Sequence, residues 1–109
     1  MKKKRSYKLS EAQTLLEIHL RELWPQFTPI KEYSFMDGRR FRFDLAILDI
    51  RLGFEVCGGS WSGGHRHGSA IERDYEKLNL AQMSGWRCLY FTNEAVLDGT
   101  AKEFLRKWA

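Results

Sequence analysis

Apolar residues recur along this chain with two different spacings, and the change of spacing predicts the order of helices and strands. Near the start they recur every three or four residues, which predicts a helix capped by Ser10 that ends at Trp24, ahead of a proline. Three segments with the alternating, aromatic and β-branched character of strands follow, over residues 30–36, 40–50 and 52–57.

The second half of the chain returns to helical spacing after a loop rich in glycine, serine and histidine. We expect that loop over residues 58–68, a helix over 69–84 closed by Gly85, a strand over 86–92 and a last helix from about Asn93. The order α-β-β-β-α-β-α predicts an α/β fold. In it, an antiparallel meander, a helical crossover and a fourth strand form a mixed four-stranded sheet flanked by helices.

The same patterns predict which side chains face the core. One face of the second strand is expected to carry Phe41, Phe43, Leu45 and Ile47, and the other face Arg42, Asp44 and Ala46. The apolar face of the helix over 69–84 is expected to consist of Ile71, Tyr75, Leu78, Ala81 and Gln82 or Met83. Trp86 and Trp108 are assigned to the core.

Two carboxylates interrupt these apolar strands. Asp44 lies in the second strand and Glu55 in the third, just ahead of the pair Gly58-Gly59. Either residue alone is typical of a polar position on a solvated sheet face. Together on neighbouring strands they are suited to a hard divalent cation, because Mg²⁺ needs only one or two carboxylates besides water and phosphate oxygens. The backbone carbonyl of Cys57 is a third candidate oxygen, whereas its thiol is a poor ligand for Mg²⁺.

The composition fits a folded protein with an anionic partner. Hydrophobic residues make up 43% and charged residues 29% of the 109 residues, and the formal net charge is +4 with a pI of about 9.2. We divide the chain into a basic N-terminal tail, residues 1–8, and one domain, residues 9–109. The lead MKKKR accounts for much of the positive charge, and it is equally consistent with an ordinary solvated tail.

Compartment and membrane association also follow from composition. No apolar run approaches the roughly 20 residues of a membrane span, and no apolar segment follows the basic lead as it does in a signal peptide. We therefore expect no membrane partner. Cys57 and Cys88 are expected to be free thiols in a reducing, cytoplasmic compartment.

The candidate chemistry outside the strands has competing interpretations. Lys77 lies within one helical turn of Arg73 and Asp74, so it either pairs with them on a solvated face or points back at the two carboxylates. A zinc site is the alternative to a magnesium site. Its four ligands would be Cys57, His65, His67 and Cys88, but this spacing matches no common zinc pattern.

Longer stretches of the sequence carry a resemblance. The segments EYSF, RRFRFDLA, FEVCGGSWSGG and ERDYEKLNLAQMSGWRCLYFT resemble a group of small phage and prophage endonucleases. These are related to the very-short-patch-repair endonucleases and Holliday-junction resolvases of the PD-(D/E)xK superfamily. The resemblance runs from about Glu11 to Thr92. It implies a restriction-endonuclease-like fold and a metal-dependent cut of DNA, with Mg²⁺ as the cofactor and Mn²⁺ able to substitute.

The resemblance also implies roles for individual residues. Asp44 and Glu55 would hold the metal, and Glu11 would match the helical glutamate that such nucleases often add, with Glu17 as the alternative. Cys57 stands where the superfamily has a lysine, so that role is assigned to Lys77 instead. The loop histidine that fits the narrower group best is His67, as a general acid or base, ahead of His65.

A basic and aromatic surface is expected around this site. Its arginines are Arg39, Arg40, Arg42, Arg51, Arg66 and Arg73. Trp61 either stacks on or wedges between bases, or covers the edge of the core. From resemblance and symmetry, a chain of this size is expected to act as a homodimer on branched or structured DNA.

Two other classes of function compete with the nuclease interpretation. A non-catalytic nucleic-acid-binding module would use the same basic face, and its binding would be sensitive to salt but would need no metal. A structural or partner-binding protein is less favoured, because the polar residues of interest converge on one region of the predicted sheet.

Overall fold

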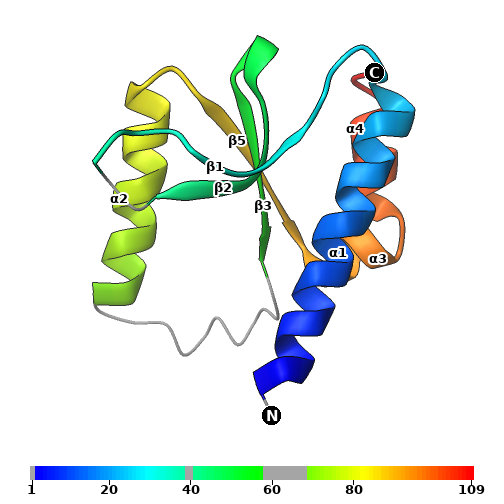
Figure 1. Cartoon of the computed structure of the whole chain (residues 1–109), viewed down its shortest axis with the longest axis horizontal. Helices are drawn as coiled ribbons and strands as arrows, with labels where there is room; N and C mark the ends of the chain where they lie inside the picture. Colours follow the sequence, from blue (N-terminus) through cyan, green and yellow to red (C-terminus); the bar gives the residue numbers. More distant parts are fainter. Residues whose placement is uncertain (1, 39–40, 58–68) are drawn as a thin grey trace.

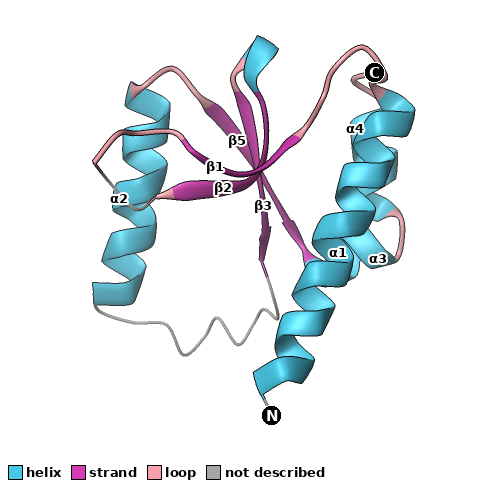
Figure 2. Cartoon of the chain, in the orientation of Figure 1, coloured by secondary structure: helices cyan, strands magenta, loops and turns pink. Residues whose placement is uncertain are grey.

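The computed structural model describes residues 2–38, 41–57 and 69–109. In chain order the elements are α1 (Lys2–Leu23), β1 (Ile30–Ser34), β2 (Arg42–Ile47), the 3-10 turn η1 (Leu48–Ile50), β3 (Leu52–Cys57), α2 (Ser69–Met83), β5 (Arg87–Thr92), α3 (Asn93–Leu97) and α4 (Thr100–Arg106). Figure 2 shows the alternation of helices and strands along the chain.

The strands form one mixed sheet in the order β1-β2-β3-β5. β1 pairs antiparallel with β2, and β2 pairs antiparallel with β3. α2 then carries the chain back across the sheet, so that β5 runs parallel to β3, with Glu55 opposite Tyr90. The α/β fold class expected from the sequence, a mixed four-stranded sheet flanked by helices, is therefore confirmed.

Helices cover both faces of the sheet, and each face has its own core. α1, α3 and α4 lie on one face and α2 on the other (Figure 1). The core on the first face is the larger of the two, and in it α1 packs against alternate residues of β3. Its fully or nearly fully buried members include Ala12, Leu16, Leu20, Leu45, Ile47, Leu52, Phe54, Val56, Val96 and Leu105.

The core on the α2 face is smaller and mostly aromatic. Phe43, Ala46, Ala81 and Trp86 are buried there, with Tyr33 and Phe35 packed against them. The ring of Phe43 lies over Gly53 so closely that a Cβ added to Gly53 would be 2.6 Å from three of its carbons. A side chain on β3 at this position is thus incompatible with the position of the Phe43 ring.

The first helix begins earlier than the sequence pattern predicts. α1 starts at Lys2 rather than after an N-cap at Ser10, so residues 2–8 belong to this helix. Lysine and arginine are good helix formers and nothing before Ser10 breaks a helix, so the helix extends through this segment. Its end at Leu23 agrees with the prediction to one residue.

The first two strands are shorter than predicted, and their alternation breaks near Asp44. β1 ends at Ser34, and β2 ends at Ile47, where η1 takes over. Phe43 and Leu45 belong to different cores, although they were expected on one face. Glu32 on β1, between the pairs Lys31–Leu45 and Tyr33–Phe43, has a φ of 49°, a left-handed conformation that interrupts regular pleating.

Two further predictions about helices are wrong. The last helix is split into α3 and α4 at Gly99, whose φ of 90° no helix accommodates. On α2, Tyr75 was assigned to the apolar face and Met83 was one of two alternatives for it, but they are 62% and 86% exposed. The side of α2 that faces the sheet instead follows Lys77 and Ala81, so the helix is rotated relative to the predicted stripe.

Trp108 is also placed differently from the prediction. Trp86 is buried, as predicted, but Trp108 is 70% exposed because it follows the last turn of α4. Cys57 and Cys88 are not joined by a disulfide, as expected. Within the described ranges, no helix has the length and apolar character needed to cross a bilayer.

The contact between Gly53 and Phe43 gives a test of the fold. We expect Gly53→Ala to lower the free energy of unfolding by about 1–3 kcal/mol, because the buried ring has to shift to make room. Urea denaturation measures the change. In a Phe43→Leu background the same substitution should cost clearly less, and an equal cost in both backgrounds would contradict the contact.

Candidate active site

The backbone pairing of β2 with β3 ends next to Asp44, and the Asp44 side chain accepts the next hydrogen bond from β3. Backbone pairing between the two strands extends to Leu45 opposite Phe54. One step further, the backbone N–H of Val56 donates to Oδ2 of Asp44 at 2.7 Å. The carboxylate therefore replaces a backbone acceptor, which holds it in a fixed position between the two strands.

Glu55 on β3 forms an ion pair with a lysine on α2, the helix that connects β3 to β5. Nζ of Lys77 on α2 donates to Oε2 of Glu55 at 2.8 Å. Both side chains are largely withdrawn from solvent, with 15% of the Glu55 side chain and 21% of the Lys77 side chain exposed. Of the two orientations that the sequence left open for Lys77, the structure shows the one directed at the carboxylates.

Glu32 and Gln13 join this group, and sequence reasoning missed both. Nε2 of Gln13 on α1 donates to Oε2 of Glu32 at 3.2 Å and to the backbone oxygen of Asp44 at 3.4 Å. A signal for Gln13 is its place beside Ala12 and one turn before Leu16 on the buried stripe of α1. For Glu32 no signal is available, since its left-handed backbone and its place opposite Asp44 appear only in the paired sheet.

The electrostatics of the group reflect crowded, partly buried carboxylates. Burial raises the pKa of Glu55 from 4.5 to about 7; the hydrogen bond from Lys77 opposes this shift, and the Asp44 charge adds to it. Burial also raises the pKa of Asp44, against the hydrogen bond from Val56, and the charge of Glu32 raises it further. Negative charge here is under-compensated by Lys77 alone, which favours an additional cation.

Two further side chains surround Glu55 on the same face of the sheet. Burial raises the pKa of the Cys88 thiol to about 12, and the charge of Glu55 adds to this. The zinc alternative also needs His65 and His67, which lie outside the described residues, so it stays a prediction. Burial likewise raises the pKa of Tyr90, the residue opposite Glu55 on β5.

The available oxygen ligands suit Mg²⁺, which keeps water in its shell, better than a metal ion that is held by protein side chains alone. Among the residues that the structure describes, no three histidine, cysteine or acidic side chains meet in a metal-binding arrangement. Asp44 and Glu55 would supply two hard oxygen ligands, with water and phosphate oxygens completing the shell, as Mg²⁺ prefers. Cys57 ends β3 on the same face as Glu55, and its backbone oxygen stays a candidate ligand.

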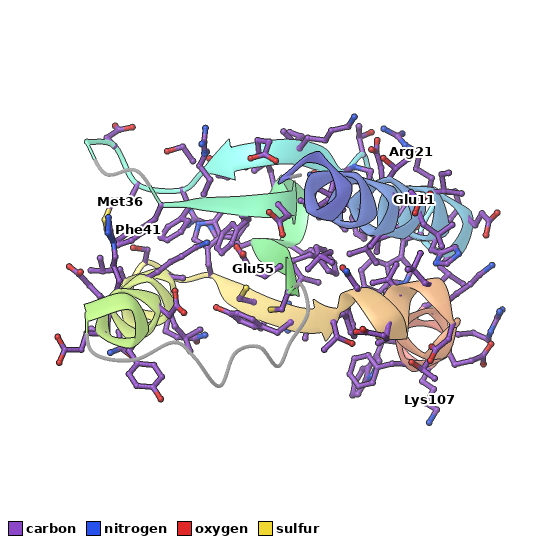
Figure 3. The ribbon with its side chains drawn as sticks, turned by 90° about the horizontal axis from the view of Figure 1, so that it is seen from below. Glu11, Arg21, Met36, Phe41, Glu55 and Lys107 are labelled. Carbon is purple, nitrogen blue, oxygen red and sulfur yellow. The ribbon has the colours of Figure 1, made fainter. Side chains whose placement is uncertain are left out.

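The helical glutamates do not join the group in the way expected. Glu11 is exposed on α1, and Figure 3 shows it apart from Glu55, which lies between α2 and the layer of α1, α3 and α4. Glu17 is paired with Arg21 at 3.0 Å and approaches Lys31 at 3.8 Å. Gln13 and Glu32 are the polar residues that lie next to Asp44 instead.

Several predicted residues lie outside the described part of the chain, and the roles assigned to them stay predictions. These are Arg39, Arg40, Trp61, His65, Arg66 and His67. Arg42 at the start of β2 and Arg73 in α2 are described, and both are exposed. Both are therefore open to contact with a bound polyanion.

Arg51 does not belong to this surface. It precedes β3, at the end of that strand opposite to Glu55, where Nη1 donates to the backbone oxygen of Ser84 at 3.1 Å. Its guanidinium also lies 5.9 Å from the ring centroid of Trp86. The expectation that Arg51 lies near the carboxylates is wrong, because a turn fixes it at the far end of the sheet.

Comparison with known proteins finds this fold in a nuclease. The catalytic domain of the homing endonuclease I-Bth0305I matches the structure with a TM-score of 0.64 and 18% sequence identity, over 88% of this chain and 90% of that chain. No protein-family model and no curated protein matches the sequence. The likeness establishes a shared fold, and the roles of individual residues have to be argued from the site.

The raised pKa of Glu55 has a consequence for stability. The unfolded chain loses the Glu55 proton near pH 4.5 and the folded chain near pH 7, so this group destabilises the fold progressively between those values. In EDTA at pH 8 we expect Glu55→Gln to be more stable than the parent by on the order of 3 kcal/mol. The advantage should vanish near pH 4, where the carboxyl is protonated in both states.

Thermal melts of both proteins across this pH range measure the difference. Glu22→Gln is a matched control, since Glu22 is also paired with a lysine, Lys102 at 2.7 Å, but burial does not dominate its environment. A Glu55→Gln protein that is less stable than the parent at pH 8 would contradict the raised pKa.

Proposed function

We propose that this chain is a divalent-metal-dependent DNA endonuclease. The observation that carries the proposal is the Glu55–Lys77 pair beside Asp44, at the end of β3. A lysine and two fixed carboxylates are the groups that phosphodiester hydrolysis requires. The shared fold with a homing endonuclease catalytic domain supports the same reaction class.

Each side chain of the site would have a separate role in the reaction. Asp44 and Glu55 would hold Mg²⁺, and Mn²⁺ would substitute for it; the ion, when bound, supplies a Lewis acid and lowers the pKa of water. Lys77 uses one of its three N–H donors on Glu55, so the others are available to a phosphate oxygen that gains charge in the transition state. Asp44 stays oriented through Val56 while this happens.

Other parts of the proposal draw on the sequence resemblance. His67 acts as general acid or base. Arg40, Arg42, Arg66, Arg73 and Trp61 contact DNA. We further propose membership of the PD-(D/E)xK superfamily, a relation to the very-short-patch-repair endonucleases, and action as a homodimer on branched or structured DNA.

The rival function is a nucleic-acid-binding module without catalysis. It shares the basic charge of the chain but gives no reason for a buried Glu55–Lys77 pair, since exposed lysines suffice for phosphate contacts. A binding module would show salt-sensitive affinity that EDTA leaves unchanged, with no cleavage under any condition. Cleavage that depends on the metal therefore separates the two functions.

The metal ligands are tested by removing one charge at a time. Asp44→Asn and Glu55→Gln should each lower Mg²⁺-dependent cleavage of plasmid and branched DNA by at least about a thousandfold, because each removes a charged ligand. Asparagine keeps an oxygen for Val56, so the Asp44→Asn protein should stay folded by circular dichroism. Full activity in EDTA, or in either variant, would refute the metal-dependent reaction.

Lys77 is tested by comparing rate with affinity. Lys77→Ala should lower the single-turnover rate by about a hundredfold or more at nearly unchanged DNA affinity, as loss of transition-state stabilisation predicts. Lys102→Ala is the control, because Lys102 forms an ion pair of similar length with Glu22 elsewhere on the surface. A loss of affinity alone would make Lys77 an ordinary phosphate contact.

A further inference from the structure

Tyr90 is an exposed aromatic residue next to the Glu55–Lys77 pair. It lies on β5 directly opposite Glu55 in the parallel pairing of β3 and β5, so both side chains emerge on the same face of the sheet. Its neighbours Leu89 and Phe91 pack against the core of the opposite face. Tyr90 is 46% exposed, although the residue contributes to neither core.

α2 packs against β5 on this face, yet nearly half of Tyr90 stays exposed. Of the α2 side chains from Glu72 to Met83, Ala81 is buried, and it packs with Phe43 and Trp86 toward the other end of the sheet. Lys77 reaches Glu55 from the middle of α2. Tyr90 on β5 is therefore a large aromatic side chain that stays partly exposed beside this pair.

The chemistry of Tyr90 suits a nucleobase better than a phosphate. A tyrosine side chain carries no charge near neutral pH, so Tyr90 does not repel DNA. A neutral aromatic ring next to a charged phosphate site offers a stacking surface, and each base that stacks on such a ring adds substantially to affinity. An aliphatic side chain would fill the same space without this preference.

The spacing of the strands brings a base within reach. Neighbouring strands lie about 4.8 Å apart, so Tyr90 is one strand away from the position of a phosphate held at Glu55 and Lys77. The bases flanking that phosphate are thus the parts of the nucleic acid nearest to the ring. Inside a duplex both faces of those bases are already stacked, and a face becomes free where the strand is unpaired.

We propose that Tyr90 stacks on an unpaired base beside the scissile phosphate, so that the site selects DNA with a single-stranded stretch next to the cut. This inference rests on the proposed function and specifies its substrate. It makes Tyr90 a specificity-determining residue, with no part in the chemical step itself.

The test compares binding to two DNA molecules in EDTA, where no cleavage occurs. One is a fully paired 30-mer duplex and the other the same duplex with a three-nucleotide gap, each labelled for fluorescence polarisation. The parent should bind the gapped DNA about tenfold more tightly, as one stacked base provides. Tyr90→Phe should keep this preference and Tyr90→Ala should lose it, with affinity for paired DNA unchanged.

Tyr75→Ala is the matched control. Tyr75 is also an exposed tyrosine, 62% exposed, but it lies two residues from Lys77 and so on another side of α2. This variant should keep the preference of the parent. In addition, 2-aminopurine placed opposite the gap should be quenched by the parent and by Tyr90→Phe but not by Tyr90→Ala.

The outcomes separate this inference from the proposed function. A parent that binds both DNA molecules equally, a Tyr90→Ala protein that keeps the preference, or a Tyr90→Phe protein that loses it would each overturn the role of Tyr90. A parent that binds neither DNA, both in EDTA and with Ca²⁺ in place of Mg²⁺, would instead overturn the proposed function. Melting curves of the variants show that the comparison concerns folded proteins.

Discussion

The pairing of Glu55 with Lys77 is the interaction on which the arrangement of the candidate site depends. It joins β3 to α2 at 2.8 Å, across 22 residues of sequence. α2 contributes little apolar burial beyond Ala81 among its described side chains, so this ion pair fixes the rotation of the helix over the sheet. Withdrawing both charges from water is costly, and such a pair is weak evidence for stability but stronger evidence for a function.

The surrounding sheet is arranged to hold charges close together. Asp44 satisfies the backbone of Val56 with its side chain, and Glu32 adopts a left-handed backbone next to it. Strained residues of this kind persist where the surrounding structure enforces them, and they concentrate at functional sites. Gln13 connects this cluster to α1, so elements from both sides of the sheet contribute to one site.

The architecture could be predicted from sequence because it follows from local patterns. The alternation of Leu52, Phe54 and Val56 gave β3 its bounds, and Gly85, with a φ of 87°, closes α2 as expected of a C-cap glycine. Asp44 and Glu55 were identifiable because each is a charged residue within an otherwise apolar strand, and the two strands are neighbours. Lys77 could be named as a candidate, but its direction depended on tertiary structure.

The remainder of the site depends on register and backbone conformation, which no local pattern encodes. Glu32 follows Lys31 in a strand with little apolar alternation, so nothing in the sequence distinguishes it from a solvated residue. The rotation of α2 was predicted wrongly because Tyr75 was counted as apolar, whereas it is 62% exposed. An ion pair formed across the crossover decided between the two orientations left open for Lys77.

Paramagnetic relaxation by Mn²⁺ tests most directly whether Asp44 and Glu55 hold a metal. In ¹⁵N-labelled protein, substoichiometric Mn²⁺ should first broaden the amide signals of Asp44, Leu45, Glu55 and Val56. Signals near Arg51 and Ser84, at the far end of β3, should stay sharp. Broadening that begins elsewhere, or that is unchanged in the Glu55→Gln protein, would contradict the account.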